Sequence, residues 1–140
     1  MSSRARLLAL ATAVLACNAY TNEITDLAYV HFGGSDSVFF SAPDTVLLGE
    51  TFQVSVRTYG GGCTREGSTR VTTQGQDALV EPFDITDRAD VCTLVLREFT
   101  HRAAVRFDVR GNAVVRVRGR ARTDTGRDTL ALRSRAVLVK

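Results

Sequence analysis

The chain has 140 residues, of which 44% are hydrophobic, and 18 Lys and Arg stand against 15 Asp and Glu. This length fits one domain and excludes a second of ordinary size, while the apolar content excludes wholesale disorder. No apolar run reaches the roughly 20 residues that cross a bilayer as a helix. The charge is uneven, because residues 18–96 carry 4 Arg against 11 Asp and Glu, whereas residues 97–140 carry 12 Arg and Lys against 4.

Residues 1–16 have the pattern of an export signal. Arg4 and Arg6 precede the apolar run Leu7–Ala16, which is too short to span a membrane. The run ends in Val14-Leu15-Ala16-Cys17. This ending resembles the lipobox of bacterial lipoproteins, in which an aliphatic, a variable and a small residue precede an obligatory cysteine. The resemblance implies cleavage before Cys17, diacylglycerol on its sulfur, and a membrane-anchored position in the cell envelope outside the cytoplasm.

Two positions depart from the lipobox and leave an alternative open. Val14 stands where that family usually has leucine, and Leu15 stands where it prefers a small residue. The alternative is ordinary signal cleavage after Ala16 or Ala19, which would give a secreted protein without an anchor.

The three cysteines fit an exported chain with one disulfide. If Cys17 carries a lipid, Cys63 and Cys92 remain as a pair in an oxidising compartment. A link closing a loop of about 30 residues is worth roughly 3.5 kcal/mol in the chain-entropy treatment. A zinc site is the rival interpretation. It is disfavoured because neither cysteine has a CxxC partner and the nearest histidine, His101, lies nine residues past Cys92.

After the signal, the hydrophobic pattern has a period of two, and no ten-residue stretch shows a helical stripe. We expect residues 17–35 to form the lipidated cysteine, a tether and the first strand, and residues 36–140 to form the β domain. Pro82 confines its strand to an edge or a bulge. The expected strands cover residues 38–40, 51–59, 78–85, 91–99, 103–109, 113–121 and 130–139, with a weaker strand around Val71.

About eight short strands separated by turn signals predict an all-β sandwich or barrel. Pro43-Asp44-Thr45-Val46, followed by Gly49-Glu50 and the alternating residues 51–56, resembles the opening strands of bacterial immunoglobulin-like domains. The resemblance implies a single immunoglobulin-like β-sandwich of about 7–9 antiparallel strands. The chain departs from antibody-type domains, because it has no tryptophan and Cys63–Cys92 is too close in sequence for the usual inter-sheet bridge.

One hairpin is predicted in detail, between residues 103–109 and 113–121. A three-residue loop, Arg110-Gly111-Asn112, would pair the inward-facing apolar residues and place Phe107 opposite Val115. On the outer face this register places Arg106 opposite Arg116. The same row continues through Arg118, Arg120 and Arg122.

This arginine row is a candidate anion-binding face. A guanidinium group suits phosphate and carboxylate, so the row could hold phospholipid head groups, lipopolysaccharide or an acidic polymer. The alternative is a solvated strand face whose arginines pair with acids from residues 77–90. Nucleic acid is disfavoured as a partner, because the chain has an export signal and lacks aromatic residues interleaved with the arginines.

Motifs for catalysis are missing from the sequence, which has no GxSxG, no HExxH and no phosphate-binding loop. His31 and His101 are isolated, and we expect His101 in a turn between two strands. Asp84, Asp87 and Asp90 recur every three residues and could offer oxygens to a cation such as calcium, although a solvated loop is the simpler interpretation.

We therefore expect no cofactor and a non-enzymatic binding or accessory module of the cell envelope. Its partner would be an unknown envelope protein, in addition to the membrane that holds the anchor. An anionic polymer or membrane surface bound through the arginine row is the second hypothesis, and an enzyme is the third.

Overall fold

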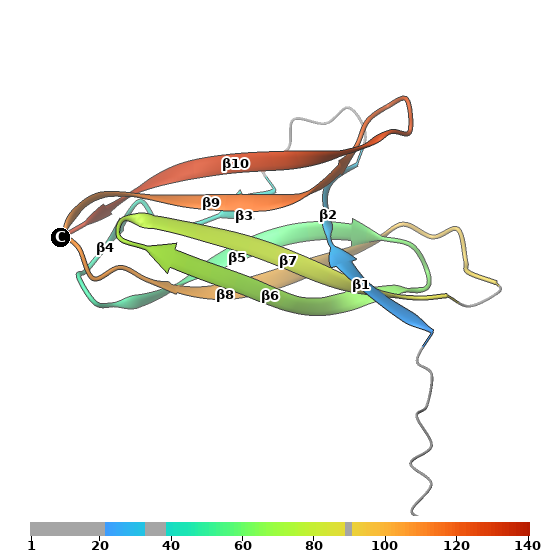
Figure 1. Ribbon diagram of the computed structural model, residues 1–140, viewed down its shortest axis with the longest axis horizontal. Helices are drawn as coiled ribbons and strands as arrows, with labels where there is room; N and C mark the ends of the chain where they lie inside the picture. The colour runs from blue at the N-terminus through green and yellow to red at the C-terminus, as the bar shows by residue number, and fades with distance from the viewer. Residues whose placement is uncertain (1–21, 33–38, 89–90) are drawn as a thin grey trace, which may run out of the picture.

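The structure is a computed structural model that describes residues 22–32, 39–88 and 91–140. Within these residues the chain is all-β, with ten strands and no helix (Figure 1). The predicted signal, Cys17 and Asp90 lie outside the described residues. The strands are β1 (Glu23–Leu27), β2 (Tyr29–Phe32), β3 (Phe40–Ser41), β4 (Thr45–Val46), β5 (Thr51–Gly60), β6 (Thr64–Gln74), β7 (Asp77–Asp87), β8 (Arg97–Arg106), β9 (Gly111–Arg122) and β10 (Asp128–Val139).

Hydrogen bonds connect all ten strands into one curled sheet. The strands fall into two groups. In the first, β5 pairs with β3 and β8. The second consists of β1, β4, β6, β7, β9 and β10. Among the described strands, β2 alone links the two groups, because it pairs with both β5 and β9. The expectation of antiparallel strands holds in part, since β4 and β10, β2 and β9, and β7 and β9 run parallel.

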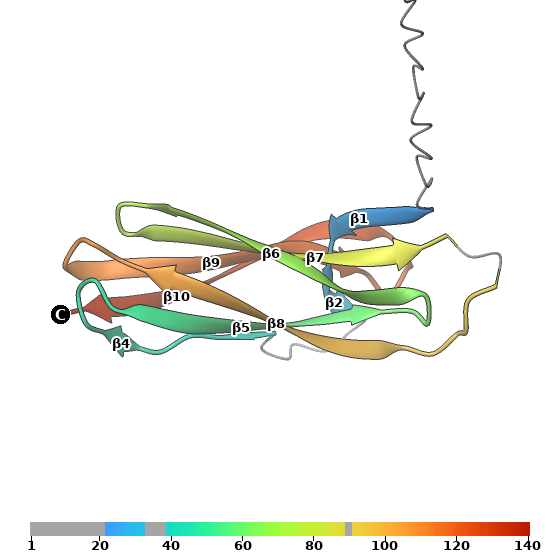
Figure 2. The same cartoon turned by 90° about the horizontal axis from the view of Figure 1, so that it is seen from below.

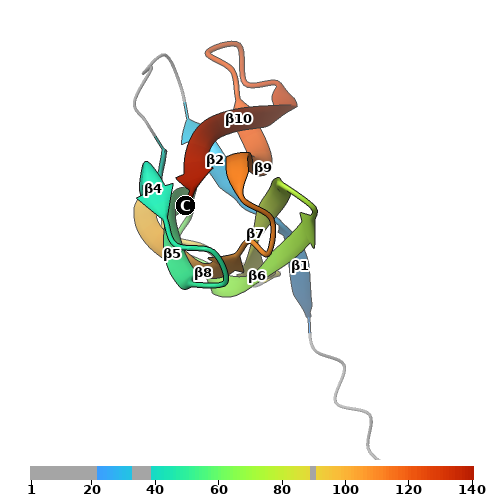
Figure 3. The same cartoon turned by 90° about the vertical axis from the view of Figure 1, so that its left-hand side faces the viewer.

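The curl brings the outer strands of the two groups together. Figure 3 shows β6 and β8 side by side, and the two strands are in contact although no backbone ladder joins them. We call this contact the seam. At one end of the sheet lie the C-terminus and the turn between β4 and β5, and at the other end lie the start of β1 and the segment 91–96 (Figures 1 and 2).

The core lies inside the curl and is filled by alternating residues of the long strands. In β5, Phe52, Val54 and Val56 face inward, as their alternation predicted. The same period of two buries Ala113, Val115 and Val117 in β9, together with Val80 and Ala78 in β7. Each strand therefore contributes one apolar face to a single core.

Pro82 lies fully buried in the middle of β7. Its carbonyl accepts a hydrogen bond from the Ala28 amide at 2.9 Å, so its nitrogen points to the same side of the strand. On that side the partner of β7 changes from β9, last paired at Val80, to β1, first paired at Phe83. On the other side, the register of β6 shifts between Glu66 and Thr69. The missing amide thus falls where one partner strand gives way to the next. Of the expected edge or bulge, β7 is not an edge strand, and the register shift lies in β6 on its other side.

The predicted hairpin between residues 103–109 and 113–121 does not form. β8 pairs along its whole length with β5, and β9 pairs with β10, so Arg106 lies opposite Thr51 and Arg116 lies opposite Ser134. Phe107 is buried against Phe52, with ring centroids 5.8 Å apart, and the chain after it crosses to the other strand group. Alternation decides which face of a strand is buried, but it does not select the neighbouring strand.

Three strand boundaries also differ from the sequence predictions. Residues 91–96 form no strand, and β8 continues without a break through His101, which was expected in a turn. The weak strand predicted around Val71 is the eleven-residue strand β6. β8 pairs with β5, and β6 pairs with β7. These ladders form despite the polar composition of β6 and β8, because a ladder satisfies backbone hydrogen-bonding groups whatever the side chains are.

Candidate binding site at the disulfide end of the sheet

A cavity of about 510 Å³ opens at the end of the sheet that carries the disulfide. Its walls are mainly apolar, and they come from β2, the end of β5 and the segment before β8. Polar groups enter the lining from β6, β7 and β9. The lining comprises Tyr29, Phe32, residues 59–64, Asp84, Thr86, residues 92–96, Arg120 and Arg122.

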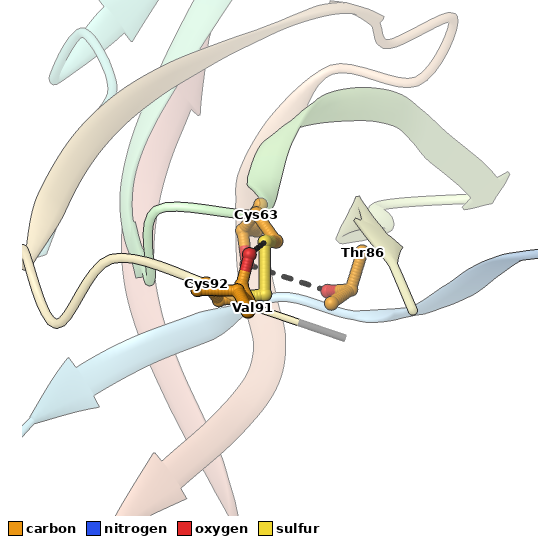
Figure 4. The surroundings of a disulfide bond; sticks show 5 residues. Cys63, Thr86, Val91 and Cys92 are labelled. Carbon is orange, nitrogen blue, oxygen red and sulfur yellow. Dashed lines mark hydrogen bonds between the residues drawn. A yellow bond between two sulfur atoms is a disulfide. The ribbon is translucent and has the colours of Figure 1, made fainter. Parts of the chain in front are cut away.

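The disulfide between Cys63 and Cys92 fixes one wall of the cavity, and it confirms the pairing expected from the cysteine count. It joins the turn after β5 to the segment before β8, and the two Cα atoms lie 5.4 Å apart (Figure 4). Beside it, the Gly62 amide donates to the carbonyl of Thr93 at 3.2 Å. The carbonyl oxygen of Val91 lies 3.7 Å from the Cys63 sulfur. The segment is therefore held in place without strand pairing.

The segment 91–96 exposes four large aliphatic side chains. Leu94 is fully exposed, Val91 is 86% exposed, and more than half of Val95 and Leu96 is exposed. Apolar side chains grouped in this way on the surface of a soluble domain mark sites of contact with a ligand, a protein or a membrane.

Asp84 supplies a buried carboxylate to the lining of the cavity. Its side chain is 4% exposed, and its Oδ1 accepts a hydrogen bond from His101 Nε2 at 2.8 Å. Its Oδ2 is buried and has no hydrogen-bond partner among the described residues. Because a buried oxygen without a partner carries a desolvation cost, a hydrogen-bond donor that reached it would be favourable.

His101 holds Asp84 from inside the sheet and is not part of the cavity lining. The ring is fully buried, and its Nδ1 lies 3.1 Å from the Thr69 hydroxyl. An ionised carboxylate only accepts hydrogen bonds, so against it the ring carries its proton on Nε2, and Nδ1 of a neutral ring then accepts from Thr69. The sequence contained a signal for this position, because His101 continues the buried row of Ala103 and Val105.

An aromatic and arginine cluster forms another wall of the cavity. Arg120 lies 4.2 Å from the centre of the Tyr29 ring, and Arg122 lies 5.5 Å from that of Phe32. The Tyr29 hydroxyl donates to Asp128 at 2.7 Å. Burial, followed by this hydrogen bond, raises the pKa of Tyr29 above its ordinary value. Hydrogen bonds from Tyr29 and Arg122 hold the pKa of Asp128 below its ordinary value.

Each of the five arginines of the predicted anion-binding face has a carboxylate partner. The four in β9 alternate on its outer side as expected, whereas Arg106 lies apart from them in β8. Arg116 and Arg118 bind acids of the range 77–90, as the alternative interpretation proposed. The N–O distances are 2.9 Å for Arg106–Asp108, 2.9 Å for Arg116–Asp77, 2.8 Å for Arg118–Glu81, 3.8 Å for Arg120–Asp26 and 3.0 Å for Arg122–Asp128.

Among the other residues singled out from the sequence, the structure joins His101, which was expected to be isolated, to Asp84, but it does not bring Asp84 and Asp87 together. Asp84 and Asp87 lie in β7 rather than in a loop, and two positions three apart on a strand face opposite sides. Within residues 22–32, 39–88 and 91–140, no group of three or more His, Cys, Asp or Glu side chains could hold a metal ion. His31 is half-buried in β2, on a different strand from the Asp84–His101 pair.

Comparisons with known protein families, with curated proteins and with solved structures find no match to this chain. In the part of the chain that the structure describes, no helix is long and apolar enough to cross a membrane. The cavity and its surroundings are therefore the basis for inferring a function.

Proposed function

We propose that this chain is an exported lipoprotein of the cell envelope whose β domain binds a small, mainly apolar ligand and catalyses no reaction. The observation that carries the binding function is the cavity at the disulfide end. Ligand pockets commonly have apolar walls, a few convergent polar groups and volumes of about 300–1,000 Å³. The apolar segment 91–96 and the unpartnered oxygen of Asp84 fit that description.

Two features support export and anchoring. A disulfide persists in oxidising compartments and is rare in the cytosol, so Cys63–Cys92 favours a position outside the cytoplasm. The lipobox-like residues 14–17 supply the signal and the acceptor cysteine.

The burial of His101 supports a role without catalysis. A catalytic base has to reach the reacting molecule, within hydrogen-bond distance or through one water. The His101 ring is fully buried between Thr69 and Asp84, so a molecule in the cavity would contact the carboxylate and not the imidazole.

For the fold family, we propose an immunoglobulin-like sandwich whose two layers have become joined. Removing β2 would leave β3, β5 and β8 as one layer and the remaining strands as the other. An experimental structure tests this proposal. Two sheets separated at β2 would support it, and a closed barrel with a ladder between β6 and β8 would contradict it.

The binding function is tested with phenylnaphthylamine, a neutral dye that fluoresces in apolar surroundings. Gly61 lines the cavity, and a Cβ built on it meets no atom within 4 Å, so Gly61→Trp adds a bulky side chain at the lining without a clash at Cβ. Ser134→Trp, at an exposed position of β10, is the matched control. We expect saturable binding that weakens about tenfold or more in Gly61→Trp and is unchanged in Ser134→Trp. Equal binding by both variants would contradict the assignment of the site.

The anchoring is tested by the intact mass of the protein taken from its own membranes, with and without reduction. A mass that includes diacylglycerol on Cys17 and a reducible bond between the other cysteines supports the proposal. An unmodified chain that begins after Ala16 or Ala19 would make the protein a secreted one.

Binding of an anionic polymer through the arginine face is a separate hypothesis. The carboxylate partners of all five arginines would have to be displaced or shared by the anion. This hypothesis predicts binding that falls steeply with salt and weakens in Arg116→Glu/Arg118→Glu. Salt-insensitive binding would remove it.

A further inference from the structure

We propose that the segment 91–96 is a membrane-docking surface and that its partner is the lipid bilayer that holds the anchor. The segment presents Val91, Leu94, Val95 and Leu96 to solvent without pairing to a strand. The disulfide at Cys92 and the hydrogen bond from the Gly62 amide to Thr93 tie the segment to the turn after β5, at the rim of the core. Aliphatic side chains held outward are favourable where they enter the boundary between head groups and acyl chains.

The path of the N-terminal chain identifies a bilayer as the occupant. The Arg88 amide donates to the carbonyl of Asn22 at 2.9 Å, and Glu23 pairs with Asp87. The start of β1 therefore lies beside the end of β7, from which the chain leads into the segment 91–96. Figures 1 and 2 show both features at the same end of the sheet, opposite the C-terminus.

The distance to the anchor is short. Cys17 precedes Asn22 by five residues, which span at most about 17 Å when fully extended. A lipid on Cys17 would hold the bilayer within that distance of the start of β1, which lies at the same end of the sheet as the exposed segment. Such tethering raises the effective concentration of the two surfaces. The nearness of the bilayer rests on the proposed lipid attachment at Cys17, whereas the exposure of the segment 91–96 does not.

The charges around the segment indicate what kind of bilayer it contacts. The segment and its neighbours carry three positive and three negative charges. They are Arg57, Arg88 and Arg97 against Asp87, Asp90 and Glu98, and Arg57 pairs with Glu98 at 3.2 Å. Because these charges balance, docking depends on apolar contact and requires no anionic lipid. We therefore expect docking to neutral phosphatidylcholine vesicles that changes little with salt. This insensitivity distinguishes it from binding through the arginine face.

Single tryptophans test the proposal, because the natural chain has none. Leu94 is exposed in the segment. Leu47 is exposed in the turn between β4 and β5, which lies at the opposite end of the sheet (Figure 1). The Leu94→Trp and Leu47→Trp full chains are purified with their anchor and reconstituted into vesicles of brominated phosphatidylcholine. We expect the emission of Trp in Leu94→Trp to be quenched about twofold or more, and that in Leu47→Trp to be unaffected. Equal emission from the two variants would overturn the docking surface.

A second pair of variants separates docking from folding defects. Leu94→Ser/Val95→Ser should lose about tenfold or more of vesicle binding when the anchor is absent, as in a Cys17→Ser chain. Leu130→Ser/Leu132→Ser, at exposed positions of β10, should lose none. The intact mass of the anchored sample distinguishes the two proposals. If Cys17 carries a lipid but the emission of Leu94→Trp is not quenched, the docking proposal is overturned and the anchoring proposal stands. If the emission is quenched but Cys17 carries no lipid, the anchoring proposal is overturned and the docking proposal stands.

Discussion

His101 on β8 and Asp84 on β7 are joined by a 2.8 Å hydrogen bond between Nε2 and Oδ1, although no backbone ladder connects their strands. Thr69 on β6 extends this chain of hydrogen bonds to the other nitrogen of the ring. The three side chains therefore cross the seam of the curled sheet. Their hydrogen bonds connect strands that no backbone ladder joins at this point. They also hold the Asp84 carboxylate, which lines the cavity, in place.

Removing the imidazole should destabilise the domain strongly. His101→Ala leaves the buried Asp84 without its hydrogen-bond donor, and we expect the free energy of unfolding to fall by about 3 kcal/mol or more. Asp84→Asn keeps an acceptor for Nε2–H, so its effect should be about 1 kcal/mol. Urea unfolding of the two variants measures the difference. Equal losses would show that the pair does not act through this hydrogen bond.

The arginine row should contribute to stability unevenly. Arg118→Ala leaves the buried Glu81 with Arg70 alone, whose nearest nitrogen lies 3.8 Å from the carboxylate. We expect the free energy of unfolding to fall by about 2 kcal/mol. Arg106→Ala breaks a pair in which both side chains are mostly exposed, and should cost at most about 0.5 kcal/mol. Thermal unfolding of both variants at one salt concentration makes the comparison. A larger loss for Arg106→Ala would contradict the assigned partners.

The Tyr29–Asp128 hydrogen bond should shape the pH dependence of stability at both extremes. The pKa of Asp128 is lowered from 3.8, so its contribution is present above that value and is lost as the pH falls through the folded-state pKa. The pKa of Tyr29 is raised from 10.0, so its contribution is present below that value and is lost as the pH rises through the folded-state pKa.

Unfolding midpoints measured across pH check this prediction. In Tyr29→Phe both limbs of the profile should become flatter. Tyr59→Phe removes a hydroxyl from the same cavity and is the matched control. An unchanged profile in Tyr29→Phe would show that the hydrogen bond to Asp128 is not formed in solution.

The disulfide should stabilise the domain mainly by restricting the unfolded chain. Its cysteines are 29 residues apart, and Cys63→Ser/Cys92→Ser should lower the free energy of unfolding by about 3.5 kcal/mol. Phenylnaphthylamine binding should weaken as well, because the segment 91–96 is released from the turn after β5. Comparison with the reduced natural chain is the control. A variant as stable as the oxidised protein would contradict this role.

Three features could be predicted from the amino-acid sequence alone: the all-β class, the strand β5 with its buried face, and the cysteine pair. These features are local or depend on residue counts. Side chains alternate across a strand, so apolar residues at Phe52, Val54 and Val56 define a buried face without knowledge of any neighbour. Three cysteines, one of them in a lipobox-like signal, leave a single pair.

The identity of neighbouring strands, and with it the candidate site, could not be predicted without the folded structure. Alternation is the same whether β8 pairs with β5 or with β9, so the hairpin predicted from it was wrong. His101 falls between the predicted strands 91–99 and 103–109, which is why a turn is expected there. Its burial depends on Asp84 and Thr69, which come from other strands. The cavity likewise gathers residues from five strands and the segment 91–96, and long-range contacts of this kind leave no local pattern in the sequence.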